Sequence, residues 1–252
     1  MNLKKLKWKL NHILSDFKED RNEGEVSYAE SRIHERYNLS IPEAILILSE
    51  TNVEYDVLNI SFGGFASSKI HDNEVLFTSG QKAIIHFMGL KSDAIIHKVY
   101  QGQYYIGFRF EHKDANTLIF LRDIVENLRL GSTMHRLRKE FLTEKYKSEL
   151  WVCMRGDGPG EIEIETNTSG KLIYLQYRFV NSSGTNYFVY SNQQCTLKVG
   201  DVESTCPPEI IRFAMNVFLG ISDQKAADIL KQFYEYIKTN NFFIPQDSSL
   251  IK

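Results

Sequence analysis

Six short runs of apolar and β-branched residues follow one another between Tyr37 and Phe110, and turn-forming residues separate several of them. Short runs of this kind with turns between them are typical of a small antiparallel barrel or sandwich. The predicted strands span residues 44–48, 53–60, 74–77, 82–88, 94–99 and 104–110. The first half of the chain is therefore predicted to be mainly β.

The pattern changes after the last of these strands. Apolar residues at helical spacing predict a helix over residues 118–128, and Gly131 stands where a C-terminal cap would. Ser132 suits the start of a second, charged helix, so a connecting helix is predicted over residues 132–148.

The remaining residues, 149–252, are predicted to form a second domain of α+β type. Its predicted strands span residues 150–154, 161–165, 172–180, 187–190 and 196–199, and its predicted helices span 208–219 and 222–238. Pro208 suits the first turn of the former helix, and Ser222 suits the N-terminal cap of the latter.

Residues 1–29 are predicted to form an amphipathic helix and a polar linker. The apolar residues that share the helical spacing are Leu3, Leu6, Leu10, Ile13, Leu14 and Phe17. Lysines cover other faces, so the helix either packs on its own protein or binds a membrane surface or a partner. We expect packing, since amphipathic helices usually pack on their own protein.

Composition and charge argue against several classes of function. The formal net charge of −2 provides no basic field, so no nucleic-acid partner is expected. We expect neither a transmembrane segment nor a secretory signal. The three cysteines, Cys153, Cys195 and Cys206, have no metal-ligand spacing and are expected to be reduced thiols of a cytoplasmic protein.

Arg32 and Arg36 are four positions apart, which places both side chains on nearly the same side of either a helix or a strand. Arginine can bind phosphate oxygens or the O6 and N7 edge of guanine through two hydrogen bonds, and its flat face can stack on a purine. A ligand that contains both phosphates and guanines would use all of these contacts. A solvated basic face is the alternative, because two arginines at this spacing are common.

Asn59, Ser61 and Gly64 lie at the end of a predicted strand. In a strand, residues 59 and 61 point to the same face. Asparagine can donate to and accept from a base edge, and serine offers a hydroxyl to a phosphate. Gly63 and Gly64 allow a sharp turn or a close approach of a ligand to the backbone. By themselves these residues suit a strand that simply ends in a turn.

Together and in this order, the two groups resemble the signature of the PilZ domain family. The matching segments are Ser-Arg-Ile-His-Glu-Arg-Tyr at 31–37, Val-Leu-Asn-Ile-Ser-Phe-Gly-Gly-Phe at 57–65 and Tyr-Ile-Gly-Phe-Arg-Phe at 105–110. The resemblance covers about residues 30–130, with Asn59 where the family often has Asp. It implies a six-stranded β-barrel, over a domain of residues 30–131, that binds the bacterial second messenger cyclic di-GMP.

The resemblance also implies a role for each residue of the signature. Arg32 and Arg36 would engage the phosphates and the guanine faces. Asn59 would read a guanine edge, Ser61 would support it or contact phosphate, and Gly64 would shape the turn. In the family, the arginine-bearing segment folds over the ligand, which agrees with the polar residues that precede Arg32.

Other candidates carry less weight. Arg109, on a late predicted strand, is a candidate peripheral ligand contact, and His34 is interpreted as a solvated loop residue. His86, His97 and His112 have no partner at metal-ligand spacing, so no metal is expected.

The second domain shows no catalytic motif. Its glycine-rich stretch 156–160 lacks the Gly-Lys-Ser/Thr ending of a Walker loop and is predicted to be a hairpin turn. Its alternating aromatic residues are predicted to pack in the core and on the sheet rather than to stack on bases. These residues are Tyr174, Tyr177, Phe179, Tyr187, Phe188 and Tyr190. With no nucleophile beside a base, no enzyme is expected.

The leading hypothesis is therefore a cyclic di-GMP receptor that controls motility, exopolysaccharide production or adhesion. Ligand binding would change how the PilZ-like domain meets the N-terminal helix, residues 149–252 or a protein partner. A protein-interaction adaptor that does not depend on nucleotide is the alternative, and an active site in residues 149–252 is a third hypothesis. The sequence leaves open the ligand stoichiometry and whether the chain forms a homodimer.

Overall fold

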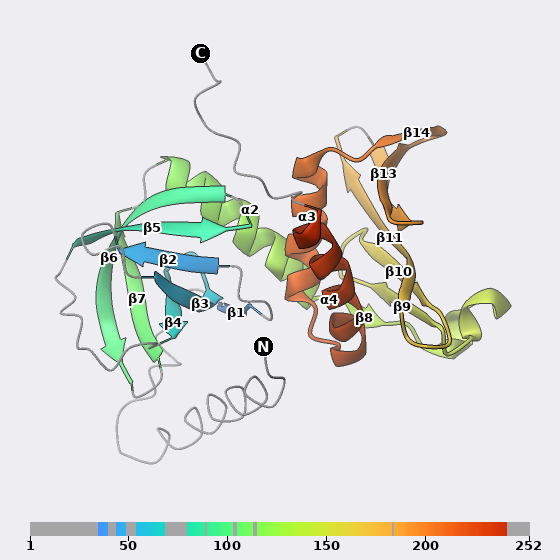
Figure 1. Ribbon diagram of the computed structural model, residues 1–252, viewed down its shortest axis with the longest axis horizontal. Coiled ribbons are helices and arrows are strands. Elements are labelled where there is room, and N and C mark those ends of the chain that lie inside the picture. Colours follow the sequence, from blue (N-terminus) through green and yellow to red (C-terminus); the bar gives the residue numbers. More distant parts are fainter. Residues whose placement is uncertain are drawn as a thin grey trace.

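Two antiparallel sheets lie side by side in the computed structural model, with helices between them (Figure 1). The structure describes residues 35–39, 44–48, 54–68, 80–88, 90–102, 105–112, 115–182 and 184–240. The helix and linker predicted over residues 1–29, the strand predicted over 74–77, and both Arg32 and His34 lie outside the described residues.

The first sheet is curled and antiparallel. Its strands are β1 (Tyr37–Asn38), β2 (Ala44–Leu48), β3 (Glu54–Ile60), β4 (Gly64–Ser68), β5 (Gln81–Phe87), β6 (Leu90–Gln101) and β7 (Tyr105–His112). Six strands follow the order β3-β2-β5-β6-β7-β4, β4 also pairs with β3, and the short β1 is added to β3. The predicted mainly β, antiparallel class is confirmed, in the form of a strongly curled sheet (Figure 1).

Five of the predicted strands correspond to β2, β3, β5, β6 and β7, with shifts of a few residues at their ends. The prediction missed β4, whose sequence Gly-Phe-Ala-Ser-Ser is poor in the β-branched residues that indicate a strand. This segment is extended because its backbone pairs on both sides, with β3 and with β7.

Buried and more exposed side chains alternate along the strands, so one face of the first sheet is buried. Phe65 of β4 and Phe108 of β7 are register partners, both are fully buried, and their rings stack at 5.1 Å between centroids. Helix α2 (Ala115–Ser132) adds Leu121, Ile124 and other apolar side chains to the same cluster. The helix predicted over residues 118–128 is confirmed and is longer at both ends.

Gly131 is not the C-terminal cap that the sequence predicted, because it lies within α2. Here α2 packs against α3 (Pro208–Gly220) of the second half of the chain. A Cβ added at Gly131 would lie 1.9 Å from the carbonyl oxygen of Val217, and one added at Gly220 would lie 2.0 Å from that of Leu128. Both glycines therefore let the two helix backbones approach closely, and through this contact the two sheets share one hydrophobic cluster.

The connecting helix predicted over residues 132–148 is wrong. The segment forms the short strand β8 (His135–Arg136) and two 3-10 turns, η1 (Lys139–Phe141) and η2 (Glu144–Lys147). Charged residues at the helical positions gave no apolar face, and neither 3-10 turn buries a residue. Pairing of β8 with β9 satisfies the backbone groups instead.

The second sheet is an antiparallel meander with α3 and α4 (Gln224–Thr239) on one face (Figure 1). Its longer strands are β9 (Trp151–Arg155), β10 (Glu161–Thr166), β11 (Leu172–Asn181), β12 (Gly184–Ser191), β13 (Gln194–Val199) and β14 (Val202–Thr205). The order is β14-β13-β12-β11-β10-β9-β8. The predicted α+β character is confirmed, and β14, like β8, was not among the predicted strands.

Residues suited to helix N-termini stand at the start of both helices in the second half. Pro208 opens α3, as predicted. Asp223, rather than the predicted Ser222, caps α4, because its carboxylate accepts a hydrogen bond from the amide of Ala226 at 2.9 Å.

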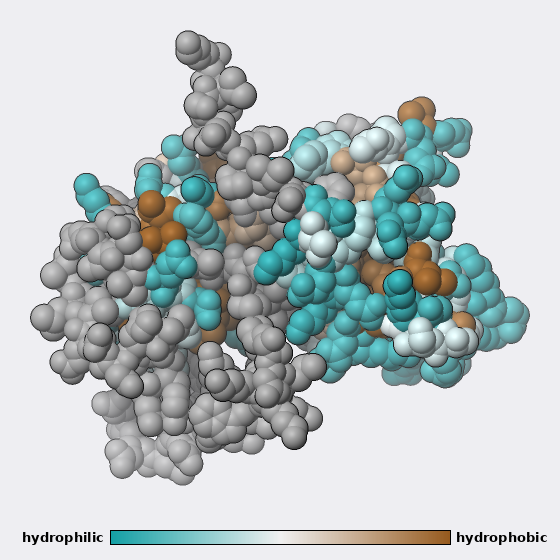
Figure 2. Space-filling view, in the orientation of Figure 1, coloured by the Kyte–Doolittle hydropathy of each residue, from teal (hydrophilic) through white to brown (hydrophobic). Residues whose placement is uncertain are grey.

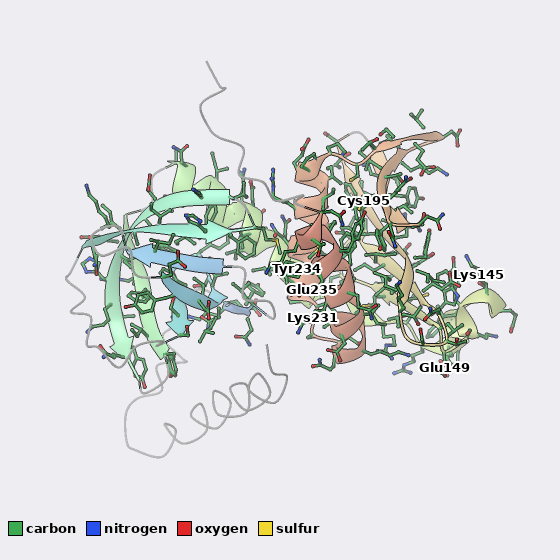
Figure 3. The ribbon with its side chains drawn as sticks, viewed as in Figure 1. Lys145, Glu149, Cys195, Lys231, Tyr234 and Glu235 are labelled. Atoms are coloured by element: carbon green, nitrogen blue, oxygen red, sulfur yellow. The ribbon has the colours of Figure 1, made fainter. Side chains whose placement is uncertain are left out.

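The outer side of α4 is polar. Lys231 and Glu235 lie on this helix (Figure 3), which buries Phe233 and Ile237 against the sheet. On the face drawn in Figure 2, hydrophilic residues cover most of the coloured surface of this half, and hydrophobic residues form small separate patches. Among the described helices, none has the length and apolarity that a bilayer crossing requires.

Candidate ligand-binding site

The two halves of the predicted signature meet at the edge of the first sheet, where β1 pairs with the end of β3. Tyr37 is the register partner of Ile60, and Asn38 is the partner of Asn59. The amide of Leu39 also donates to the carbonyl oxygen of Leu58 at 2.9 Å. Continued by one residue, this antiparallel register sets Arg36 opposite Ser61.

Tyr37 fixes the segment that carries Arg36. Its ring is 7 % exposed and belongs to the hydrophobic cluster, and its hydroxyl donates to Oε2 of Glu35 at 2.7 Å. Burial, together with this hydrogen bond, raises the pKa of Tyr37 to about 12. The half-buried Arg36 is therefore held between an anchored aromatic ring and the end of β3.

Ser61 holds the turn that follows β3. Its amide and its hydroxyl both donate to the carbonyl oxygen of Gly64, at 2.8 and 2.9 Å, and the amide of Gly64 donates back to the hydroxyl at 3.2 Å. Ser61 is 3 % exposed. This geometry fits the supporting role that was predicted for Ser61, since the hydroxyl hydrogen already has an acceptor.

Gly64 is required by the close approach of two backbones. It is the register partner of Arg109, and an added Cβ would lie 2.0 Å from the carbonyl oxygen of Phe108. No side chain fits there without moving β4 away from β7, so the turn and the strand pairing both depend on glycine at this position.

Asn59 presents an incompletely paired polar group. The residue is 7 % exposed, and its Oδ1 makes no hydrogen bond with any residue that the structure describes. Such an acceptor is costly when it is buried without a partner. The position suits a ligand group that donates a hydrogen bond, such as the amino group at the edge of guanine.

Arg109 is exposed on β7, beside the turn. Its register partners are Gly64 on one side and His97 on the other. Nε2 of His97 lies 3.1 Å from Oε2 of Glu111, so this carboxylate faces the histidine. The structure therefore places the predicted peripheral contact Arg109 next to the signature turn, on the same outward face as Asn59.

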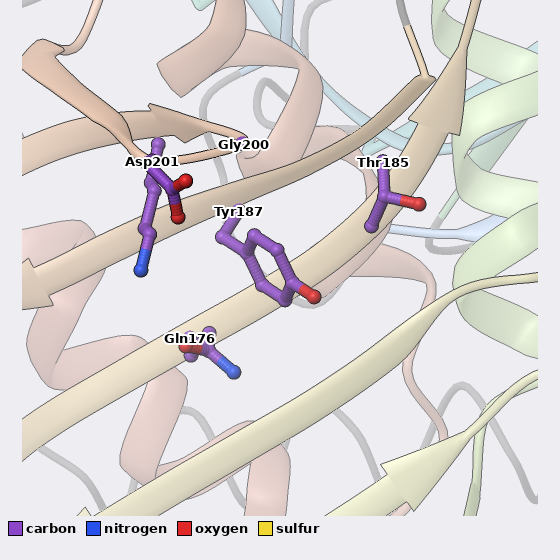
Figure 4. A pocket seen from close by; sticks show the side chains of 6 residues that line it. Gln176, Thr185, Tyr187, Gly200 and Asp201 are labelled. Atoms are coloured by element: carbon purple, nitrogen blue, oxygen red, sulfur yellow. The ribbon is translucent and has the colours of Figure 1, made fainter.

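A competing hollow in the second half of the chain lies on the face of the second sheet away from its helices. Figure 4 shows Gln176, Thr185 and Tyr187 on neighbouring strands, with the turn of Gly200 and Asp201 at the rim. The hollow is wide open and lies on a strand surface. Its side chains form no arrangement of nucleophile and base.

Cysteine chemistry finds no support in the described structure. Burial raises the pKa of Cys153 to about 11 and the pKa values of Cys195 and Cys206 to about 12, so all three remain thiols near neutral pH. Cys195, on β13, is labelled in Figure 3 among the side chains beside the helices. The described residues contain no group of three or more His, Cys, Asp or Glu side chains that could hold a metal ion.

The aromatic residues of the second sheet fall into two groups. Tyr177, Phe179, Phe188 and Tyr190 are buried in the core, as predicted. Tyr174 and Tyr187 are only partly buried and point to the opposite face, in phase with polar neighbours.

Neither a protein-family model nor a curated protein matches the chain. Among solved structures, it is similar to the PilZ domain of YcgR from Escherichia coli, in a structure with c-di-GMP. The identity is 15 %, the TM-score is 0.28, and the match covers 39 % of this chain and 91 % of that one. We base the function on the residues of the site rather than on this likeness.

Proposed function

We propose that this chain is a bacterial cytoplasmic receptor for cyclic di-GMP and that the ligand binds at the edge of the first sheet. The observation that carries the proposal is the β1–β3 register, which brings Arg36 beside Ser61 and the buried, incompletely paired Asn59. An arginine fork and an amide oxygen at one edge suit a ligand with phosphates and guanines.

Each residue has a distinct role in this proposal. Arg36, with Arg32 from the same signature, binds the phosphates and stacks on a guanine face. Oδ1 of Asn59 accepts from the guanine amino group. Ser61 and Gly64 hold the turn, and Arg109 adds positive charge beside it.

The ligand signal is proposed to reach the second half of the chain through α2. This helix contacts both β1, which follows Arg36, and α3 of the second half. A ligand that binds Arg36 therefore acts next to an element that both halves share. It changes their arrangement only if its affinity differs between the two arrangements.

Calorimetric titration with cyclic di-GMP tests the proposal. Arg36→Ala is expected to weaken binding about ten- to a hundredfold, because a hydrogen bond to a charged group contributes about 1.5–3 kcal/mol. Arg155→Ala, on the second sheet, is the matched control and should leave the affinity unchanged. Equal affinities of a folded Arg36→Ala variant and the wild type would contradict the proposal.

Protein binding through the second half is our second proposed function, and one residue favours it. Phe141 in η1 is 77 % exposed, and large aromatic side chains frequently anchor protein interfaces. A copy of the same chain is the simplest partner to test. Light scattering should then show a mass above that of one chain, which Phe141→Ser lowers without changing ligand affinity, and a wild-type mass of one chain would exclude this partner.

A further inference from the structure

A small apolar pocket lies where the end of α2 meets the glycine-rich hairpin between β9 and β10. Its volume is about 150 Å³. Met134, Tyr177 and Phe179 line the pocket and are buried, and the half-buried Leu130 and Phe213 add apolar walls. An apolar cavity of about 150 Å³ that is lined by such side chains can bind a benzene ring. The pocket is therefore suited to one aromatic side chain.

Glycines of the hairpin leave room beside the pocket. An added Cβ at Gly160 would lie 2.7 Å from Cε of Met134, and one at Gly156 would lie 3.0 Å from Oγ1 of Thr133. Side chains at these two positions would therefore crowd the residues that line the pocket. An added Cβ at Gly158 would have no atom within 4 Å, so the outer side of the turn is open.

Phe141 is an aromatic side chain that the chain leaves uncovered. Among the exposed large hydrophobic residues that the structure describes, it has the largest exposed fraction, 77 %. The amide of Phe141 donates to the carbonyl oxygen of Arg138 at 3.0 Å, which fixes the turn η1 that carries the ring. An exposed aromatic ring on a fixed turn loses little backbone freedom on binding and is suited to anchor a protein interface.

The pocket and Phe141 stand at the two ends of one open sheet edge. Met134 directly precedes β8, and Phe141 follows β8 in η1. Even a fully extended chain would separate these two residues by at most about 25 Å. Among the described strands, β8 pairs only with β9, and both residues of β8 are exposed. The other edge of β8 can therefore face a second copy of the chain.

A two-fold axis through the middle of this edge would bring the edges of two copies together in antiparallel orientation. Phe141 of each copy then lies at the Met134 end of the other, so both pockets are filled at once, as in an isologous dimer. The exposed Glu140 comes near Arg136 of the second copy, whose guanidinium has donors beyond its bond to Asp223. This charge complementarity favours a second copy as the occupant.

We propose that Phe141 of each copy binds the apolar pocket of the other in an isologous dimer. The inference rests on the protein binding proposed above as a second function, and it adds the surface that receives Phe141. It does not depend on cyclic di-GMP binding, because none of these residues belongs to the predicted signature.

Val180→Glu tests the pocket by light scattering over a range of protein concentrations. Val180 lines the pocket and is 46 % exposed, so the substitution brings a carboxylate to an apolar site without opening the core. We expect the dissociation constant of the dimer to rise at least about tenfold. Val202→Glu is the matched control and should dimerise like the wild type, because Val202 is 70 % exposed on β14, outside the pocket.

An equimolar mixture of two variants distinguishes a paired contact from a general loss of folding. Phe141→Ser keeps the pocket and Val180→Glu keeps the ring, so one intact contact can form between them. The mixture should therefore associate more tightly than either variant alone. A dimeric wild type whose affinity Val180→Glu leaves unchanged, or a mixture that associates no better than its components, overturns the inference. A wild-type mass of one chain excludes a copy as the partner and so overturns the proposal on which the inference rests.

Discussion

The two sheets are both antiparallel and both bury one face, but their outward faces differ in how polar groups are paired. On the second sheet, Glu161 accepts hydrogen bonds from Arg178 at 2.7 Å and from Nε of Arg155 at 2.9 Å. On the first sheet, Asn59 keeps a buried oxygen that makes no hydrogen bond to the described residues. The carboxylate of Glu161 thus finds its hydrogen bonds within the second sheet. In our proposal, a ligand supplies the hydrogen bond that the oxygen of Asn59 lacks on the first sheet.

The pKa of Glu161 shows how strong this pairing is. Burial alone would raise the pKa, but hydrogen bonds from Arg178 and Arg155 bring it below the ordinary value of 4.5. Nearby, the hydroxyl of Tyr146 donates to Oε2 of Glu163 at 2.9 Å. Charged residues on a sheet face therefore do not by themselves indicate a ligand site, and the pairing of their atoms is the better guide.

The largest loss of stability is expected at Gly64, where the first sheet requires a residue without a side chain. Gly64→Ala places a Cβ where the carbonyl oxygen of Phe108 lies 2.0 Å away, so β4 must move. We expect the free energy of unfolding to fall by about 2 kcal/mol or more. Urea unfolding measures this loss. Gly158→Ala is the control, and if both variants unfold alike, the close approach of β4 and β7 is wrong.

Asn59→Leu should separate stability from binding. Removing the buried oxygen is expected to raise the free energy of unfolding of the ligand-free protein by about 1 kcal/mol, while cyclic di-GMP affinity falls at least about tenfold. Urea unfolding and calorimetry provide the two readings. Asn59→Asp, the residue common in the family, should retain binding. A less stable Asn59→Leu protein with normal affinity would mean that Oδ1 is satisfied within the chain.

On the second sheet, replacing a half-buried polar partner should lower the free energy of unfolding, whereas Asn59→Leu should raise it. Glu161→Gln removes the charge between two arginines, and we expect a loss of about 0.5–1 kcal/mol in stability, since Arg155 and Arg178 are partly exposed. Cyclic di-GMP affinity should stay the same. A changed affinity would show that the two outward faces are not independent.

The smallest effect is a pH dependence of this ion pair. Because the pKa of Glu161 is lowered in the folded protein, its stabilisation is complete above the ordinary value of 4.5 and is lost as the pH falls through the folded value. The stability difference between wild type and Glu161→Gln should therefore shrink in acid. Urea unfolding at neutral pH and well below 4.5 measures it, and a difference that grows in acid would reverse the assigned sign.

Much of the first sheet could be predicted from the sequence, because local runs of apolar residues predict strands such as Ala44–Leu48 and Glu54–Ile60. The resemblance identified Arg36, Asn59, Ser61 and Gly64 as one group, and all four lie near the turn that follows β3.

The register shifts of the first sheet could not be predicted in this way. Two of them lie between Val57 and Asn59 and between Lys98 and Tyr100. A bulge changes which face a side chain occupies, and nothing in the local pattern reveals it. The close contact of Gly131 with Val217 was missed for a similar reason, since it joins segments far apart in the sequence.

Hydrogen exchange with and without cyclic di-GMP tests most directly whether the ligand completes the outward face of the first sheet. We predict slower exchange on ligand addition in β1, the β3–β4 turn and β7, with the amides of β10, β11 and β12 unchanged on the same time scale. Protection confined to the second sheet, or no protection in either sheet at saturating ligand, would contradict this account.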